Sequence, residues 1–241
     1  MKPPSPLSGL RVAVTGGTPG LGLALVDLLH REGASVAFVA RRADRVAAVA
    51  AGHRGAHGLV GDVSVKEDTH RLALRILAAL GGLDVLIHNA SSLGPVPLAP
   101  LADTACEALE EALATNLVGP FRLTKALLVA LTAAARESRP ALVLHIVSDA
   151  AFTAYPGWGA YGASKAALAH LSRIWDEELR PHGVRSLALD PGDMDTPLHA
   201  LAVPDADPAT LKRPEQSAAE ILAFLKEHAH ARRDRAGTPA A

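Results

Sequence analysis

The stretch LRVAVTGGTPGLG, residues 10–22, decides the fold because it joins an apolar run directly to a glycine-rich loop. Residues 10–15 are typical of a short buried strand, and residues 20–31 of a helix. Such a loop lets the backbone approach a ligand closely, and the helix N-terminus presents free N–H groups to an anion. A plain turn is the alternative. The position favours a dinucleotide pyrophosphate site formed by Gly16, Thr18, Pro19, Gly20, Leu21 and Gly22.

The alternation of strand and helix continues along the chain. Strands are predicted at residues 10–15, 35–40, 57–61, 83–88, 141–147 and 184–189. Helices are predicted at residues 20–31, 43–51, 65–80, 102–135, 159–180 and 214–229, the fourth bent or broken at Gly119-Pro120. This pattern predicts an α/β fold: one Rossmann-type, doubly wound parallel sheet with helices on both faces.

Composition indicates a single domain over residues 1–241, with 49% hydrophobic and 20% charged residues to form its core and surface. The net charge of −1 argues against a nucleic-acid partner. We find no apolar run of the roughly 18 residues that a membrane span needs and no signal-peptide pattern, so we expect a cytoplasmic protein without membrane contact. The histidines are scattered, so no metal site is expected.

Three segments lack the pattern of regular structure. Residues 1–8 and about 231–241 are expected to be disordered. Residues 190–214 are rich in proline and aspartate and without clean periodicity, so they are predicted to form a mobile flap over the substrate.

Two arginines follow the second predicted strand, where a dinucleotide enzyme reads the adenosine ribose. Enzymes that bind NAD place a carboxylate there, whereas this chain has Arg41 and Arg42. Guanidinium groups suit a 2′-phosphate, which favours NADP(H) over NAD(H). The alternative is that one arginine merely pairs with Asp44 on the surface.

Tyr161 and Lys165 stand four residues apart in the predicted helix 159–180, so both lie on one face. A phenol has a pKa near 10 and is a poor base at neutral pH. A nearby ammonium and the positive charge of an oxidised nicotinamide would favour the phenolate. Tyr161 is therefore a candidate acid/base for a carbonyl or an alcohol, and a solvated helical face is the alternative.

Two further polar residues are candidates for the same site. Ser148 ends the fifth predicted strand, at the sheet edge where ligands bind, and could orient a substrate oxygen. Asn116, after the fourth strand, could hold a water near Lys165. By themselves, both residues are as readily explained as caps or turn residues.

From these residues onward the chain resembles the classical short-chain dehydrogenases/reductases. Gly16, Gly20 and Gly22 fit the T-G-x-x-x-G-x-G pattern of that family, and Asn116, Ser148, Tyr161 and Lys165 match its catalytic tetrad in order and spacing. The resemblance implies further cofactor contacts, which are Asp62, Val63, Asn89, Ala90, Pro191, Gly192, Met194 and Thr196.

The chain departs from the family pattern in two places. His88 and Ser91 replace the first Asn and the Gly of its N-N-A-G stretch. No apolar run follows the last predicted helix, so a seventh strand should be absent or irregular, and the tetramer interface that uses it is in doubt. The resemblance still implies a homodimer or homotetramer.

The resulting hypothesis is an enzyme that reduces a ketone or aldehyde with NADPH. Tyr161 would donate the proton, Lys165 would tune it, Ser148 would orient the substrate oxygen, and Asn116 would hold a relay water. Two alternatives stay open: an NAD-dependent alcohol dehydrogenase, and a regulator that binds a dinucleotide without turnover.

Overall fold

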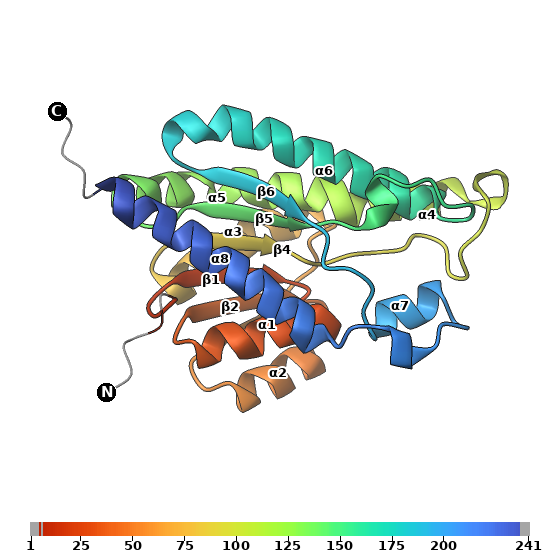
Figure 1. Ribbon diagram of the computed structural model, residues 1–241, viewed down its shortest axis with the longest axis horizontal. Coiled ribbons are helices and arrows are strands. Elements are labelled where there is room, and N and C mark those ends of the chain that lie inside the picture. The colour runs from red at the N-terminus through yellow and green to blue at the C-terminus, as the bar shows by residue number, and fades with distance from the viewer. Residues whose placement is uncertain (1–4, 6, 237–241) are drawn as a thin grey trace.

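A single sheet of six parallel strands organises the computed structural model, which describes residue 5 and residues 7–236 (Figure 1). The strand order is β3-β2-β1-β4-β5-β6, which confirms the predicted doubly wound sheet. Within the residues described there is no seventh strand. The strands are β1 (Arg11–Thr15), β2 (Ser35–Ala40), β3 (His57–Val60), β4 (Val85–His88), β5 (Leu142–Ile146) and β6 (Arg185–Leu189).

Helices cover both faces because successive strand side chains point to opposite sides. On β1, Val12 and Val14 join one core cluster, and Ala13 joins the other. The first cluster packs under α1 (Gly20–Arg31), α2 (Ala43–Gly52) and α8 (Pro214–Ala236), and α8 crosses the front of the sheet in Figure 1. The second packs under α3 (Lys66–Leu80), α5 (Gly119–Arg136) and α6 (Gly159–Leu179).

The structure describes parts of both chain ends that the sequence analysis expects to be disordered. Leu7 is fully buried in the core cluster beneath α1, because an apolar side chain at this position gains more from burial than the short segment loses in entropy. Helix α8 continues to Ala236, past the predicted end at residue 229, because residues 230–236 are mainly alanine and arginine, which favour helix. Residues 1–4, 6 and 237–241 lie outside the described part.

The predicted helix 102–135 is divided differently from the expectation. A short 3₁₀ turn (Leu101–Asp103) precedes α4 (Cys106–Leu113), and a π-helical turn (Ala114–Val118) leads directly into α5. The Gly119 N–H donates to the carbonyl of Ala114, five residues back, so the helix widens before Pro120 instead of breaking at it.

The continuous helical stretch Cys106–Arg136 is long and apolar enough, by length and composition alone, to cross a membrane, contrary to our expectation from the sequence. Three of its leucines, Leu123, Leu127 and Leu131, are buried in the core against the sheet. Packing on the sheet therefore accounts for its apolar composition.

The strand order reverses between β1 and β4, which are neighbours in the sheet although β2 and β3 intervene in the chain. Ligands of open α/β folds bind at such a switch point, beyond the carboxyl ends of the strands. The short helix α7 (Pro197–Ala202) lies beyond this edge of the sheet (Figure 1). The fold thus places the end of β1, the N-terminus of α1 and the segment 190–214 around a common space.

Candidate functional site

A cleft of about 570 Å³ opens at the carboxyl edge of the sheet. Each of the six strands contributes the residues that follow it, from the loop after β1 to the segment 190–203 after β6. The cleft brings together every site residue predicted from the sequence except Asn116, which is fully buried behind it: Gly16, Thr18, Pro19, Gly20, Leu21, Gly22, Arg41, Arg42, Asp62, Val63, Asn89, Ala90, Ser148, Tyr161, Lys165, Pro191, Gly192, Met194 and Thr196.

The glycine-rich loop leaves no room for side chains along one wall of the cleft. Gly16 and Gly20 have positive φ angles of 70° and 50°. A Cβ on Gly20 would lie 2.9 Å from Thr196 Cγ2, and one on Gly22 would lie 2.0 Å from the Gly16 carbonyl oxygen. Helix α1 starts here after Pro19 without a side-chain cap or an acidic residue in its first turn. Its first amide groups and its positive dipole end therefore suit an anion.

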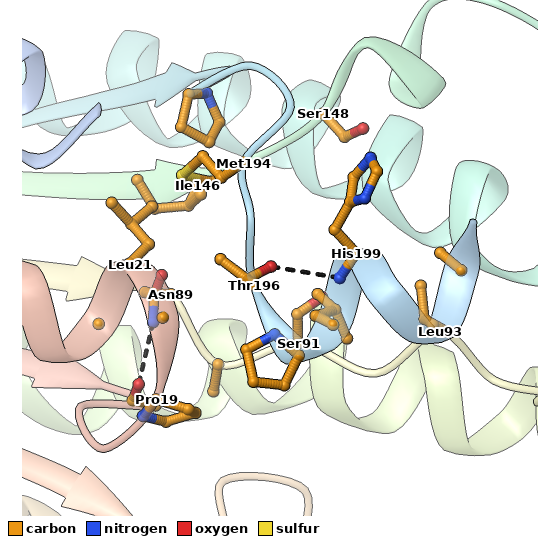
Figure 2. Close-up of a pocket in the computed structure, with 18 of the residues that line it drawn as sticks. Pro19, Leu21, Asn89, Ser91, Leu93, Ile146, Ser148, Met194, Thr196 and His199 are labelled. Atoms are coloured by element: carbon orange, nitrogen blue, oxygen red, sulfur yellow. Dashed lines mark hydrogen bonds between the residues drawn. The ribbon is translucent and has the colours of Figure 1, made fainter. Parts of the chain in front are cut away.

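Asn89 stabilises this loop through hydrogen bonds from its side chain. Its side-chain Nδ2 donates to the carbonyl oxygens of Thr15 and Gly16, both at 3.1 Å, and Figure 2 shows Asn89 above the loop that contains Pro19. The Ala90 N–H donates to Thr15 Oγ1 at 3.1 Å. Asn89, predicted as a cofactor contact, therefore also fixes the loop that would hold the pyrophosphate.

Three exposed arginines border the far end of the cleft. Arg42 pairs with Asp44 at 2.6 Å, and this contact raises the pKa of Arg42, so the surface pair considered from the sequence is present. Arg41 lies 4.0 Å from Asp62 and is 72% exposed, which leaves its guanidinium accessible. Arg45, in the first turns of α2, also lines the cleft and was not predicted from the sequence. The three charges favour a phosphate at this end.

Tyr161 and Lys165 lie one helical turn apart on the face of α6 that closes the cleft. Tyr161 is 8% exposed and Lys165 is 2% exposed. The Lys165 ammonium donates to the Ile146 carbonyl at 2.8 Å and lies 5.5 Å from the centroid of the Tyr161 ring. The helical spacing and the sheet edge together hold a phenol beside an ammonium, as the sequence predicts.

Burial is the largest cause of the pKa shifts of Tyr161 and Lys165. It raises the pKa of Tyr161 to about 12, although the hydroxyl groups of Ser148 and Ser91 act in the opposite direction. It lowers the pKa of Lys165 to about 8, partly offset by Asp190. The expectation from the sequence is that Lys165, together with the positive charge of an oxidised nicotinamide, favours the phenolate; among the protein's own groups, desolvation of the phenolate is the largest effect.

Ser148 stands at the end of β5 with an acidic neighbour. Its Oγ donates to Asp149 Oδ1 at 2.9 Å and accepts from the Ala150 N–H at 3.2 Å. The other Asp149 oxygen accepts from the Tyr155 hydroxyl at 2.7 Å. Tyr155 and Trp158 line the cleft, whereas Phe152 is not among the cleft residues and is 71% exposed.

Asn116 joins two segments behind the cleft. Its Nδ2 donates to the Ser92 carbonyl and to Ser164 Oγ, both at 2.8 Å, and its Oδ1 accepts from the Ser92 N–H at 2.8 Å. Both N–H bonds of the amide are therefore directed to the protein. Its side chain anchors the loop after β4 to α6, and the role of holding a water stays a prediction.

The segment after β6 covers the cleft with residues that sequence reasoning missed. Thr196 caps α7 by accepting from the His199 N–H at 3.2 Å, and His199 extends from α7 toward Ser148 (Figure 2). Leu198 and Ala202 pack around Tyr161 in a small apolar cluster. No periodicity marks these positions in the sequence, so only the structure identifies them as cleft residues.

A dinucleotide fits these residues. A Cβ on Gly16, Gly20 or Gly22 would clash with Ala90, with Thr196 or with the Gly16 carbonyl oxygen, so the loop packs without side chains, which suits a backbone that approaches a pyrophosphate. The uncapped N-terminus of α1 would hold the phosphates, and the arginines at the far end would meet a 2′-phosphate. Among the residues described, no cluster of metal-ligand side chains competes for the site.

Comparison with known proteins leads to the same family. The model of the short chain dehydrogenase family matches residues 11–207. The chain is 32% identical to 2,5-dichloro-2,5-cyclohexadiene-1,4-diol dehydrogenase of Sphingobium indicum, over 80% of this chain and 76% of the relative. It is 37% identical to cis-2,3-dihydrobiphenyl-2,3-diol dehydrogenase of a Pseudomonas species, over 78% and 67% of the two chains.

A solved structure shows the same likeness in three dimensions. A short chain dehydrogenase of Shigella flexneri, complexed with NADP, superposes with a TM-score of 0.81 at 27% identity, covering 88% of this chain and 89% of the other. The family model, the relatives and the solved structure all indicate the same family. The chain belongs to the short-chain dehydrogenase family of oxidoreductases.

Proposed function

We propose that this protein interconverts a ketone or aldehyde and the corresponding alcohol with NADP(H) as its cofactor. The observation that carries the proposal is the juxtaposition of the Tyr161 phenol and the Lys165 ammonium on the wall of a cleft with a phosphate-binding loop. Family membership gives the reaction class, and the residues of this cleft supply the rest of the argument.

Tyr161 acts as the proton donor in the reducing direction. With a pKa of about 12, its hydroxyl is protonated at neutral pH, which suits an acid that protonates a carbonyl oxygen. The bound dinucleotide supplies the hydride in reduction and accepts it in oxidation. The Lys165 ammonium stabilises the phenolate left on Tyr161, and the Ser148 hydroxyl lies beside the reacting oxygen to orient it.

The preference for NADP(H) rests on the arginines. Arg41, Arg42 and Arg45 border the cleft where the adenosine ribose would lie, and no carboxylate stands at the position after β2 that would bind a free ribose. Asp44 holds only Arg42. The related structure from Shigella flexneri was complexed with NADP, which supports the same preference.

The substrate is proposed to be a small alcohol or its ketone. Two curated relatives are named as dehydrogenases of ring diols, which supports an alcohol on a ring as the reacting group. The wall beside Tyr161 contains the apolar side chains Leu93, Trp158 and Leu198, which suit such a ring.

A carbonyl screen tests this function directly. The purified protein is mixed with NADPH and a series of uncharged ketones and aldehydes, and the loss of NADPH absorbance is followed. Consumption with at least one carbonyl is expected, and faster consumption of NADPH than of NADH. Tight binding of NADPH without consumption by any carbonyl in the series would instead favour a regulator that binds the dinucleotide.

A further inference from the structure

Charged side chains divide between the two ends of the cleft. The adenosine end has the three arginines with one carboxylate, Asp62, whereas the catalytic end has the carboxylates of Asp149, Asp190 and Asp193 with one histidine, His199. Among the described residues that line the catalytic end, Lys165 is the only lysine or arginine, and it is buried with its ammonium bonded to the Ile146 carbonyl. The catalytic end therefore carries an excess of negative charge.

Asp149 is the carboxylate next to the reacting position. It follows Ser148 in the chain and accepts hydrogen bonds from three uncharged donors: Ser148 Oγ, Tyr155 OH and the Ala150 N–H. These contacts lower the pKa of Asp149, so it is ionised at neutral pH. An ionised carboxylate forms stronger hydrogen bonds to hydroxyl groups than a neutral acceptor does.

Asp149 Oδ2 has one protein donor, the Tyr155 hydroxyl, and the side chain is exposed. A carboxylate oxygen can accept two hydrogen bonds, so one more hydroxyl can be accommodated there. When Ser148 binds the reacting oxygen, a second hydroxyl on the adjacent carbon would lie close to Ser148. Asp149, which follows Ser148 in the chain, could then accept a hydrogen bond from it. The site therefore offers a second acceptor to a diol.

The remaining walls are apolar and aromatic. The Trp158 ring lies 5.8 Å from the Tyr161 ring in an edge-to-face arrangement, and Leu93, Leu198 and Ala202 complete the cluster. An apolar ring can fill this space, whereas an anionic group would lose hydration beside the carboxylates of Asp149, Asp190 and Asp193.

We infer that the substrate is an uncharged ring alcohol with a second hydroxyl on the neighbouring carbon, or its hydroxyketone, and that Asp149 binds this second hydroxyl and excludes anionic substrates. The inference rests on the function proposed above. In oxidation the diol loses a hydride from carbon to NADP⁺ and a proton from the reacting hydroxyl to Tyr161, in the phenolate form that the Lys165 ammonium and the oxidised nicotinamide would favour, which gives the hydroxyketone. The second hydroxyl stays intact.

Four matched ring compounds test the inference. They are cyclohexanol, cis-cyclohexane-1,2-diol, cis-2-hydroxycyclohexanecarboxylate and cis-2-aminocyclohexanol, each oxidised with NADP⁺ by the native protein, by Asp149→Ala and by Asp205→Ala. Asp205 is an exposed residue of the segment 190–214 that does not line the cleft, so its replacement controls for the loss of a surface charge. The measured quantity is kcat/KM for each compound, expressed relative to cyclohexanol.

The native protein should favour the diol over cyclohexanol by about 10- to 100-fold, the range for a hydrogen bond to a charged group. Asp149→Ala should bring this ratio close to one and should increase the relative rate for the carboxylate, while Asp205→Ala should leave both ratios unchanged. Because each ratio refers to cyclohexanol, a general effect of the mutation on Ser148 cancels.

A diol preference that survives in Asp149→Ala would overturn the inference, as would native oxidation of the carboxylate as fast as the diol. A strong preference of the native protein for the amino alcohol would also overturn it, because the site would then select a cation. Turnover of cyclohexanol or of simple aldehydes with no preference for the diol would reject the inference alone. No turnover of any alcohol, aldehyde or ketone would reject the proposed function itself.

Discussion

The Lys165 ammonium lies 5.5 Å from the centroid of the Tyr161 ring, held there by its hydrogen bond to the carbonyl of Ile146. The spacing of one helical turn on α6 fixes the distance from the ammonium to the ring. The position of Ile146 at the end of β5 fixes the hydrogen bond. The pair thus depends on the packing of a helix against a strand end, so its geometry is set before any ligand binds.

Cofactor preference should change when Arg41 is replaced. Arg41→Asp places a carboxylate where we expect the 2′-phosphate, so NADPH should bind about 10- to 100-fold more weakly and NADH at least as well as before. The measurement is the dissociation constant of each dinucleotide by fluorescence titration. Arg54→Asp, an exposed arginine outside the cleft lining, is the matched control. Equal losses for NADPH and NADH would contradict the role assigned to Arg41.

Acid stability should depend on a buried imidazole. His145 is fully buried against His88, and its ring nitrogens have no hydrogen-bond partner. Burial lowers the pKa of His145 to about 3, below its value of about 6.5 in an unfolded chain. Between these values the unfolded state binds the extra proton, so stability is lost as the pH falls from about 6.5 toward 3, by about 1.4 kcal/mol per pH unit.

The variant His145→Leu should make this pH dependence shallower, because the leucine has no proton to bind. Urea unfolding at several pH values between 4 and 7 measures the effect. His70→Leu, at an exposed position on α3, should keep the native dependence. An unchanged slope in His145→Leu would show that other groups cause the loss of stability in acid.

Asn116 should contribute mainly to stability. Asn116→Ala removes the partners of the Ser92 N–H, the Ser92 carbonyl and Ser164 Oγ, and leaves them buried or half-buried. The free energy of unfolding should fall by about 2–3 kcal/mol, and Ser164→Ala, which removes one of these contacts, should cost about 1 kcal/mol. Equal stability of Asn116→Ala and the native protein would refute the anchoring role.

We propose that two copies associate through α5 and α6. Val129 on α5 is 82% exposed and Ile174 on α6 is 44% exposed, beside the stacked rings of Phe121 and Trp175. Val129→Lys should shift the protein from dimer or tetramer toward monomer in sedimentation, because a charge would be buried in the interface. Leu74→Lys, at an exposed position on α3, is the control. Identical sedimentation of the native protein and Val129→Lys would contradict this interface.

The fold could be predicted from the sequence because each strand and helix has a clear pattern. The predicted strand at residues 35–40 and the predicted helix at residues 20–31 coincide with β2 and α1. The errors lie where tertiary contacts decide the outcome. Leu7 is ordered by the core beneath α1, and the π-helical turn before Gly119 follows from the packing of a proline-containing helix, neither of which has a local signature.

The site could be predicted where spacing carries the chemistry, as for the glycine loop and for Tyr161 and Lys165. The segment 190–214 was expected to lie over the substrate, but its individual contacts could not be predicted, because His199 and Leu198 reach the cleft only through the path of the chain after β6. The Asp149 contact with Ser148 was also missed, although the adjacent carboxylate was visible in the sequence. Burial, which a sequence does not show, raises the pKa of Tyr161 to about 12, a contribution that the spacing of Tyr161 and Lys165 does not reveal.

The most direct test of the account is turnover by Tyr161→Phe, which removes the phenol oxygen and little else. The native protein and the variant are compared for NADPH binding by fluorescence and for carbonyl reduction by NADPH consumption. We predict that NADPH binds equally well to both, while kcat of the variant falls by about 100- to 10,000-fold, the contribution of a positioned acid. Normal turnover in the variant would contradict the assignment of Tyr161 as the acid/base.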